Sequence, residues 1–428
     1  MFCMKKLFLF FALCFFFAAI LSAQNFSVRF EMDPRLDKSL FSLSELPAEP
    51  FMRSALLASG AGQEELERHL KALEALRQEL SARLSSLQSE EEKADAILFF
   101  IYEKLLSKYD FYQTRVDLAL ESGVYNCVSS AIIFMYFCKA AGLPVVANET
   151  PRHAFCSIFQ DGQAIDVETT NPYGVNPGKK RGQNLGGGKS QWITVPAKNY
   201  SGRRQVDDRR TVAMIYNNRI SQLQRKKQDA QTVGLAVDAY ELQGHSAVSR
   251  NDLELCVGNV SALLTREGRE EEAVAFLRKA EKAFGSCDSW TKKISNNYYN
   301  WALKKIKSES LEESWAFLDE NKENFSQKDF AELKEAACLT AAASAAGKRD
   351  WRAAIAIVDQ GLKELGQSKR LQNSKSAYQQ NVAIDFHNAA ADLFNAGKKD
   401  EALEKIKEGL AEMPDNKILL SDLSKMSN

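Results

Sequence analysis

Apolar residues recur every three to four positions over residues 64–87, in the stretch EELERHLKALEALRQELSARLSSL. This spacing places the leucines on one face of an amphipathic helix. His69 lies beside that apolar face, so we expect it on the surface. Ser89 and Glu92 then form a capping-box pattern, which predicts the start of a second amphipathic helix over about residues 90–106.

The stretch SGVYNCVSSAIIFMYFCKAAGLP, residues 122–144, is apolar at almost every position after its polar start. Asn126 is a suitable N-cap, and Gly142 followed by Pro144 predicts a helix end near Ala141. A helix that is apolar on most sides is buried. The pattern therefore predicts a helix at the centre of a domain.

After this helix, apolar residues recur at every second position, as in a β-strand. RHAFCSIF and QAIDVETT predict two short strands joined by a turn at Asp161 and Gly162. Pairing about this turn places Ser157 opposite Asp166, and His153 then shares a sheet face with Asp166. A glycine-rich loop containing GGGKS follows, but Gln183 stands where a phosphate-binding loop requires glycine, so no nucleotide cofactor is expected.

From about Val206 onward the pattern predicts one helix after another. Small residues recur at the same offsets in two segments, as Gly268, Ala273 and Ala280 and as Gly397, Ala402 and Gly409. Such spacing lets the two helices of a hairpin approach closely. These segments resemble tetratricopeptide-type repeats over about residues 236–423, and the resemblance implies a solenoid with a concave binding face.

Composition and the N-terminus set the class of protein. The 428 residues are 45% hydrophobic, which is enough for roughly two or three domains. The 56 basic and 56 acidic residues balance, so we do not expect nucleic acid as a partner. Residues 1–23 combine two lysines, an apolar run and small residues, which predicts a cleaved secretory signal peptide, with an uncleaved anchor as the alternative. We therefore expect a periplasmic or secreted protein with no further membrane segment.

Six of the eight cysteines lie beyond the predicted signal peptide, and their spacing forms neither a disulfide framework nor a CxxC zinc motif. One or two disulfides are compatible with an oxidising compartment. Cys138 falls on the same helix face as Cys127, and Cys156 has the opposite strand parity to Ser157, so both are predicted core residues. We expect no metal site and no cofactor.

Cys127 lies in the first turn of the buried helix, where the helix dipole and free N–H groups favour a thiolate and stabilise an oxyanion. His153 begins the first hairpin strand and is the predicted base. Asp166, on the second strand, is the predicted carboxylate that orients it. Regular pairing leaves His153 and Asp166 about 13 Å apart, so a bulge or a register shift is required. Glu168 shares the same face and is the alternative carboxylate.

These features resemble the transglutaminase-like superfamily, a papain-like cysteine fold: a cysteine opening a buried helix, AAGLPV closing it, HAF on the next strand and DV on the strand after. The resemblance covers about residues 90–175. It implies a triad of Cys127, His153 and Asp166 acting on a glutamine-type or peptide amide. Many members have tryptophan where Phe155 stands and proline where Val167 stands, which leaves the substrate open.

Three further residues are assigned by position. Asn171 and Tyr173 follow the second strand and are predicted to line the site. Arg152, beside His153, is expected to be a surface or substrate-facing charge and not a catalytic residue. These assignments come from order along the chain alone.

The sequence thus predicts an α+β transglutaminase-like (papain-like) domain, residues 24–203, then a linker helix, 204–235, and an all-α tetratricopeptide-like helical solenoid, 236–428. The predicted function is an exported cysteine enzyme that acts on a protein or peptide amide, by hydrolysis or acyl transfer through a thioester. The repeats would bind a protein partner. The alternative is a catalytically inactive scaffold in which the repeats alone carry the function.

Overall fold

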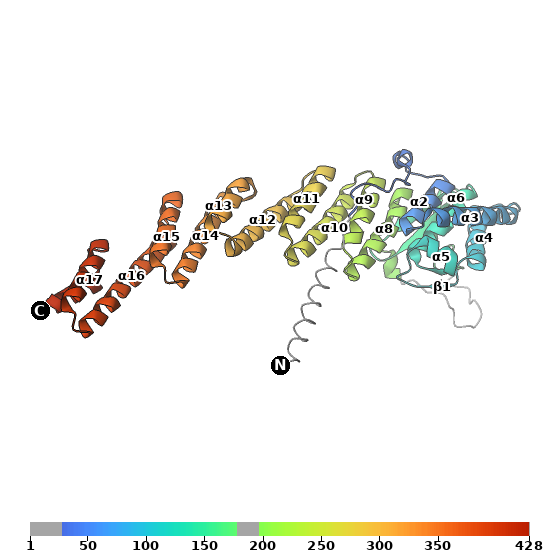
Figure 1. The fold of residues 1–428 in the computed structure, drawn as a ribbon. Helices are drawn as coiled ribbons and strands as arrows, with labels where there is room; N and C mark the ends of the chain where they lie inside the picture. The colour runs from blue at the N-terminus through green and yellow to red at the C-terminus, as the bar shows by residue number, and fades with distance from the viewer. Residues whose placement is uncertain (1–27, 178–196, 428) are drawn as a thin grey trace, which may run out of the picture. The chain divides into compact units, whose positions relative to one another are not determined.

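A computed structural model describes residues 28–177 and 197–427. The predicted signal peptide and the GGGKS loop lie outside the described residues. The chain forms two compact units, Met1–Val260 and Ser261–Asn428 (Figure 1). Each unit is described separately below.

The first unit is built mainly from helices. Its helices are η1 (Lys38–Ser42), α2 (Ala48–Ser59), α3 (Gln63–Leu84), α4 (Glu90–Lys104), α5 (Val116–Ser122), α6 (Cys127–Ala140), η2 (Ala197–Tyr200), α8 (Asp208–Arg225) and α9 (Ala230–Leu242). The next helix, α10 (Ala247–Arg266), includes residues of both units. The capping box predicted for Ser89 and Glu92 is present at the start of α4.

One four-stranded antiparallel sheet lies in this unit, in the order β5-β4-β3-β6. Its strands are β3 (Val145–Glu149), β4 (Ala154–Gln160), β5 (Gln163–Val167) and β6 (Arg204–Val206), and a separate parallel pair joins β1 (Lys108–Tyr109) to β2 (Val124–Tyr125). Asp161 and Gly162 form the β4–β5 turn with φ of 51° and 79°. Both values lie in the region that a two-residue hairpin turn requires. Ser157 pairs with Asp166, so the predicted register is confirmed.

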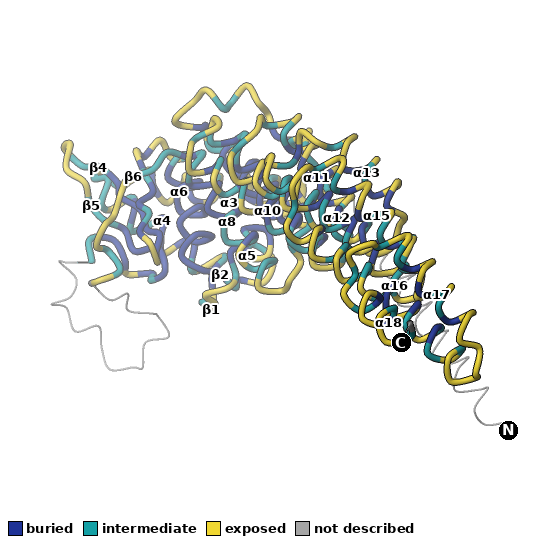
Figure 2. The backbone as a smooth tube through the Cα atoms, turned by 90° about the vertical axis from the view of Figure 1, so that its left-hand side faces the viewer, coloured by how far each residue is buried: buried dark blue, intermediate teal, exposed yellow. Residues whose placement is uncertain are grey.

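Helix α6 is the centre of the first core. Asn126 is its N-cap, and every residue from Cys127 to Cys138 is buried. Figure 2 shows α6 as part of the buried region of this unit. Helices α2, α4 and α8 and strands β3 and β4 all contact α6. The prediction of a central buried helix is therefore confirmed.

The predicted fold class, an α+β papain-like domain followed by an all-α solenoid, is wrong. Helices make up most of the described residues, and the described strands form only the small sheet and the two-residue pair. Helices before the sheet and after it share one core with α6. The motif over about residues 90–175 specifies one helix and one hairpin, but it does not specify the helices that enclose them. The chain is predominantly helical, with a small antiparallel sheet in its first unit.

Two local predictions also differ from the structure. The expected linker, residues 204–235, belongs to the first unit, because Val212, Ile215 and Tyr216 of α8 lie in its core. His69 is buried, not on the surface, and its Nε2 lies 3.5 Å from a carboxylate oxygen of Glu121. The leucine pattern locates the apolar face of α3 but not the neighbours that cover its edge.

The second unit consists of consecutive helices, and each α-helix contacts the next α-helix along the chain. They are α11 (Glu270–Phe284), α12 (Asp288–Ser308), α13 (Leu311–Glu320), η3 (Lys322–Asn324), α14 (Gln327–Gly347), α15 (Trp351–Leu365), α16 (Lys369–Asn395), α17 (Lys399–Glu412) and α18 (Lys417–Ser427). The close approach predicted from small residues is seen at Gly409. A Cβ atom there would lie 2.8 Å from Leu419 Cδ1 and 2.9 Å from Phe386 Cγ.

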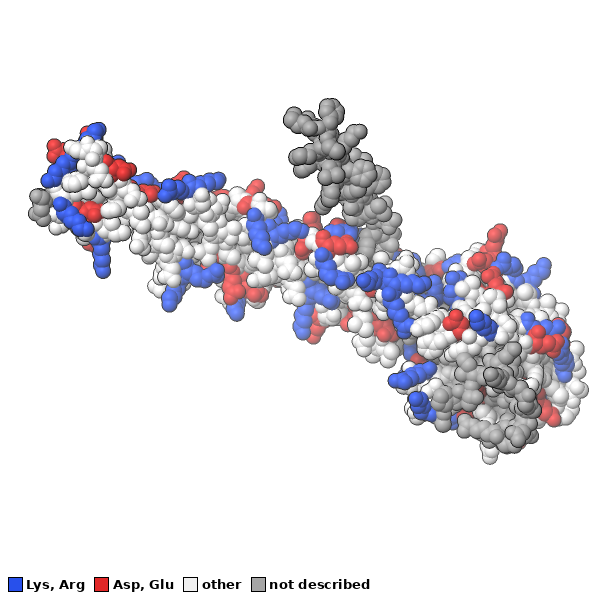
Figure 3. Space-filling view, turned by 90° about the horizontal axis from the view of Figure 1, so that it is seen from below, with Lys and Arg blue, Asp and Glu red and all other residues white. Residues whose placement is uncertain are grey.

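Charged side chains of both signs are interspersed on the face shown in Figure 3. This agrees with the balanced composition of 56 basic and 56 acidic residues. Among the helices of the described residues, none combines the length and the apolar composition that crossing a membrane requires.

Candidate active site

Cys127 is the first residue of α6 and is 8% exposed. The helix begins here because Asn126 is extended and its Oδ1 accepts the N–H groups of Val128 and Ser129, both at 3.0 Å. The thiol therefore lies at the positive end of the helix dipole.

His153 lies at the end of a tight turn between β3 and β4. Thr150 holds this turn, because its Oγ1 accepts the N–H of His153 at 2.9 Å and its own N–H donates to the His153 carbonyl at 2.9 Å. Cys127 and His153 line the same cavity, and the interaction of their side chains is among the causes that raise the pKa of His153. The structure thus brings together the predicted nucleophile and the predicted base.

The carboxylate beside His153 is Glu168. The Nε2 atom of His153 lies 2.7 Å from Glu168 Oε2, and both side chains are buried. Because Nε2 is engaged by the carboxylate, Nδ1 is the ring nitrogen that remains for the thiol. The site is therefore Cys127, His153 and Glu168.

Asp166, the predicted carboxylate, does not contact His153. Its Oδ1 accepts a hydrogen bond from Ser157 Oγ at 2.9 Å, and its Oδ2 pairs with Arg203. The regular register is kept without a bulge, so Asp166 stays four positions from His153 along the strands. Glu168 lies two positions nearer on the same face and has the longer side chain, which is why it reaches the imidazole.

Three further donors fix the carboxylate of Glu168. Oε1 accepts the N–H of Thr170 at 3.1 Å and its hydroxyl at 2.7 Å. Oε2 accepts the hydroxyl of Tyr200, from η2. The sequence pattern did not single out Thr170 or Tyr200. Tyr200 is 32 residues from Glu168 along the chain, and no local pattern indicates that contact.

The backbone after β5 folds back on itself and holds Glu168 in place. The Glu168 N–H donates to the Gly174 carbonyl at 2.9 Å. A Cβ atom at position 174 would lie 1.9 Å from the Glu168 carbonyl oxygen, so only glycine fits there. Asn171 Oδ1 accepts the N–H of Tyr173 within this turn. Asn171 and Tyr173 thus shape the turn and do not line the cavity at Cys127, contrary to the prediction.

Electrostatics favour a charged imidazole. Burial opposes protonation of His153, but the hydrogen bonds with Cys127 and Glu168 and the charges of both partners outweigh it and raise the pKa of His153 to about 10. Burial likewise opposes ionisation of Glu168, yet His153, Tyr200 and Thr170 hold its pKa below the ordinary value. A buried ion pair of imidazolium and carboxylate results.

This ion pair predicts a pH dependence of stability. The pKa of His153 is 6.5 in the reference state and about 10 in the folded protein, so its contribution is complete below pH 6.5 and is lost as the pH rises toward 10. The pKa of Glu168 is lowered, so its contribution is present above pH 4.5 and is lost as the pH falls through the folded value. We expect the free energy of unfolding to fall by about 2 kcal/mol between pH 6.5 and pH 8.

Urea denaturation at both pH values measures this change, with Glu168→Gln as the matched variant. Because that variant lacks the carboxylate, its unfolding free energy should change much less over the same interval. If the unfolding free energy fell equally in both proteins between pH 6.5 and pH 8, the His153–Glu168 pair would not be the cause of the pH dependence.

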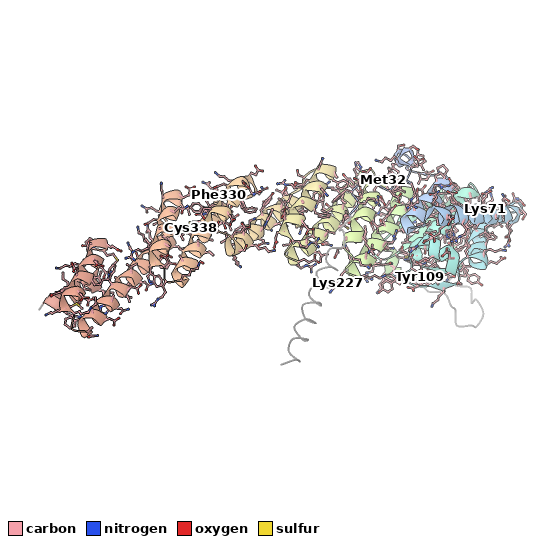
Figure 4. All side chains as sticks on the ribbon, in the orientation of Figure 1. Met32, Lys71, Tyr109, Lys227, Phe330 and Cys338 are labelled. Carbon is pink, nitrogen blue, oxygen red and sulfur yellow. The ribbon has the colours of Figure 1, made fainter. Side chains whose placement is uncertain are left out.

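A cavity of 210 Å³ in the first unit opens onto the pair. Its lining residues include Cys127, His153 and Arg152 together with Phe111, Asn126, Val128, Glu149, Met214, Asn217 and Asn218. Burial is the main cause that raises the pKa of Tyr109 (labelled in Figure 4), and an electrostatic interaction with Cys127 is the next. Tyr109 therefore lies near the thiol. The thiol is therefore accessible to a small group.

The other cysteines do not compete for these roles. None of the six cysteines of the described residues forms a disulfide. Cys138 and Cys156 are buried core residues, as predicted, and burial raises the pKa of each. The described residues hold no cluster of three or more histidine, cysteine or carboxylate side chains suited to a metal ion.

Comparisons with known proteins do not assign the chain to a family. No protein-family model matches it, and no curated protein matches it. Among solved structures, it is similar to menin, whose crystal structure reveals the binding site for Mixed Lineage Leukemia (MLL) protein. The two are 11% identical, the similarity covers 86% of this chain and 76% of that chain, and the TM-score is 0.31. At that TM-score the similarity supports no statement about fold or site.

Proposed function

We propose that this protein is an exported cysteine enzyme that acts on an amide of a protein or peptide through a thioester. The observation that carries the proposal is a cavity lined by Cys127 and His153, with His153 Nε2 lying 2.7 Å from the buried carboxylate of Glu168. A thiolate paired with an imidazolium, with a carboxylate behind it, is the arrangement that acyl transfer requires. The predicted signal peptide is the basis for export.

The proposed reaction has two halves. The Cys127 sulfur attacks the carbonyl carbon, and His153 gives its proton to the departing amine as the carbon–nitrogen bond breaks. Water or an amine then attacks the thioester, His153 takes the incoming proton, and the carbon–sulfur bond breaks to restore the thiolate. Glu168 stabilises the imidazolium and fixes its orientation.

The start of α6 supplies an oxyanion donor. Asn126 already accepts the N–H groups of Val128 and Ser129, and its carbonyl accepts that of Ser130. Of the N–H groups in the first turn of α6, that of Cys127 has no acceptor among the described residues, and it lies beside the attacking sulfur. We assign this group to the oxyanion of the tetrahedral intermediate.

The alternative is a scaffold in which the helices of the second unit carry the function. One observation favours a binding role for them: a hollow of 610 Å³ whose lining includes Trp351, Phe386, Arg352 and Lys405. Arg352 and Lys405 also lie over the Phe386 ring, at 5.8 and 5.7 Å from its centroid. Aromatic and arginine side chains are enriched where proteins bind each other. A protein partner on this unit is compatible with either function.

Acylation by p-nitrophenyl acetate tests the enzyme proposal. The protein should gain one acetyl group at Cys127, seen by intact mass after acid quenching, and then lose it as the thioester is hydrolysed. Cys127→Ala should gain none, and His153→Ala should acylate about a hundredfold more slowly at pH 6. Equal acetylation of the Cys127→Ala variant would overturn the proposal and favour the scaffold.

A further inference from the structure

The turn that positions His153 also positions a positively charged residue, Arg152, beside it. Residues 150–153 join β3 to β4, and Thr150 Oγ1 accepts the N–H of Arg152 at 3.3 Å and that of His153 at 2.9 Å. Pro151 has a fixed φ, which further limits the turn. Arg152 therefore has a defined place next to the base, and its side chain is exposed and lines the cavity.

Arg152 has no acidic partner. Throughout residues 28–177 and 197–427, no carboxylate lies within ion-pair distance of its guanidinium. The carboxylate that lines the cavity, Glu149, already forms ion pairs with other residues. Its Oε1 pairs with Arg210 at 2.6 Å and its Oε2 with Arg204 at 2.7 Å. Among the cationic side chains that line the cavity, Arg152 is thus the one that no carboxylate of the described residues pairs with.

The remaining walls suit a short carbon chain. Phe111, Val128 and Met214 supply apolar surface to the lining of the cavity. A guanidinium presents a fork of N–H donors that matches a carboxylate. An acyl group that carries an acid would therefore pair with the Arg152 guanidinium while its carbonyl reaches the thiol.

We propose that Arg152 binds a carboxylate of the substrate, so that the site prefers acyl groups bearing an acidic group near the reacting carbon. This inference rests on the proposed function, because it names the class of substrate for the same site. Arg152 acts in specificity and takes no part in the proton transfers.

Two alkylating reagents of similar size test it. Iodoacetate carries a carboxylate next to the carbon that sulfur attacks, and iodoacetamide carries a neutral amide there. The ratio of their rates at Cys127 measures the preference for the acid. His153 attracts iodoacetate in every variant, so the contribution of Arg152 is read from the change in this ratio between variants.

We expect the ratio to fall about two- to fivefold in Arg152→Gln, the effect of one exposed ion pair. Arg152→Lys keeps the charge and should retain most of the ratio. Lys71→Gln removes one positive charge from α3, away from Tyr109 in Figure 4, and should leave the ratio unchanged. A change in the ionisation of the thiol alters both rates alike and cancels in the ratio, so the ratio reports the contact with the carboxylate.

The outcomes separate this inference from the proposed function. If iodoacetamide labels Cys127 no faster than the partly exposed Cys287, the activated thiol itself is absent and the enzyme proposal fails. If Cys127 labels rapidly but Arg152→Gln keeps the wild-type ratio, only the role of Arg152 is overturned.

Discussion

Replacing His153 with alanine is expected to slow the alkylation of Cys127 by iodoacetamide about a hundredfold at pH 6. An ordinary thiol with a pKa of about 8.5 is ionised to only ~0.3% at that pH. In the structure, Cys127 opens α6 and shares its cavity with His153, the base that would take the proton of the thiol. Peptide mapping after a timed reaction gives the rate at each cysteine.

The pH profile distinguishes activation from simple accessibility. At pH 9.5 an ordinary thiol is mostly ionised, so the difference between the wild type and His153→Ala should shrink to a few-fold. Cys287, which is partly exposed, provides an internal reference in the same sample. A His153→Ala variant that keeps the wild-type rate at pH 6 would rule out the thiolate–imidazolium pair.

Glu168→Gln is expected to lower the rate of acyl transfer at least a hundredfold, whereas Asp166→Asn should change it less than threefold. Glu168 is buried and hydrogen-bonded to His153 at 2.7 Å, so its removal leaves the imidazolium without its counter-charge. It should also destabilise the fold by about 3 kcal/mol. Asp166 pairs with Arg203 in a partly exposed position, and an exposed pair contributes about 1 kcal/mol or less.

The two variants make a matched comparison, because each exchanges one carboxylate for its amide on the same strand face. Turnover of an acyl substrate by each purified protein gives the rates, and urea denaturation gives the stabilities. Glu168→Asp adds a second control, since it keeps the charge but shortens the reach to His153. If Asp166→Asn proves the more damaging change, the assignment of Glu168 is incorrect.

The sequence by itself determined the elements that depend on neighbouring residues. The apolar run after Asn126 gave the buried helix, and the Asp161–Gly162 turn fixed the pairing of Ser157 with Asp166. Those patterns are local, because a cap, a hydrophobic period and a turn each act over a few residues. The proximity of Cys127 and His153 could therefore be predicted from the order of the elements.

Only the tertiary structure decided the carboxylate and the fold around it. The choice of Glu168 over Asp166 depends on side-chain reach at the end of a strand and on donors from Thr170 and Tyr200. Tyr200 comes from a separate segment, and the surrounding helices pack on α6 through contacts distant in the chain. Such long-range contacts leave no pattern in the spacing of hydrophobic residues. The sequence therefore indicated the chemistry of the site, and the packing determined which carboxylate completes it.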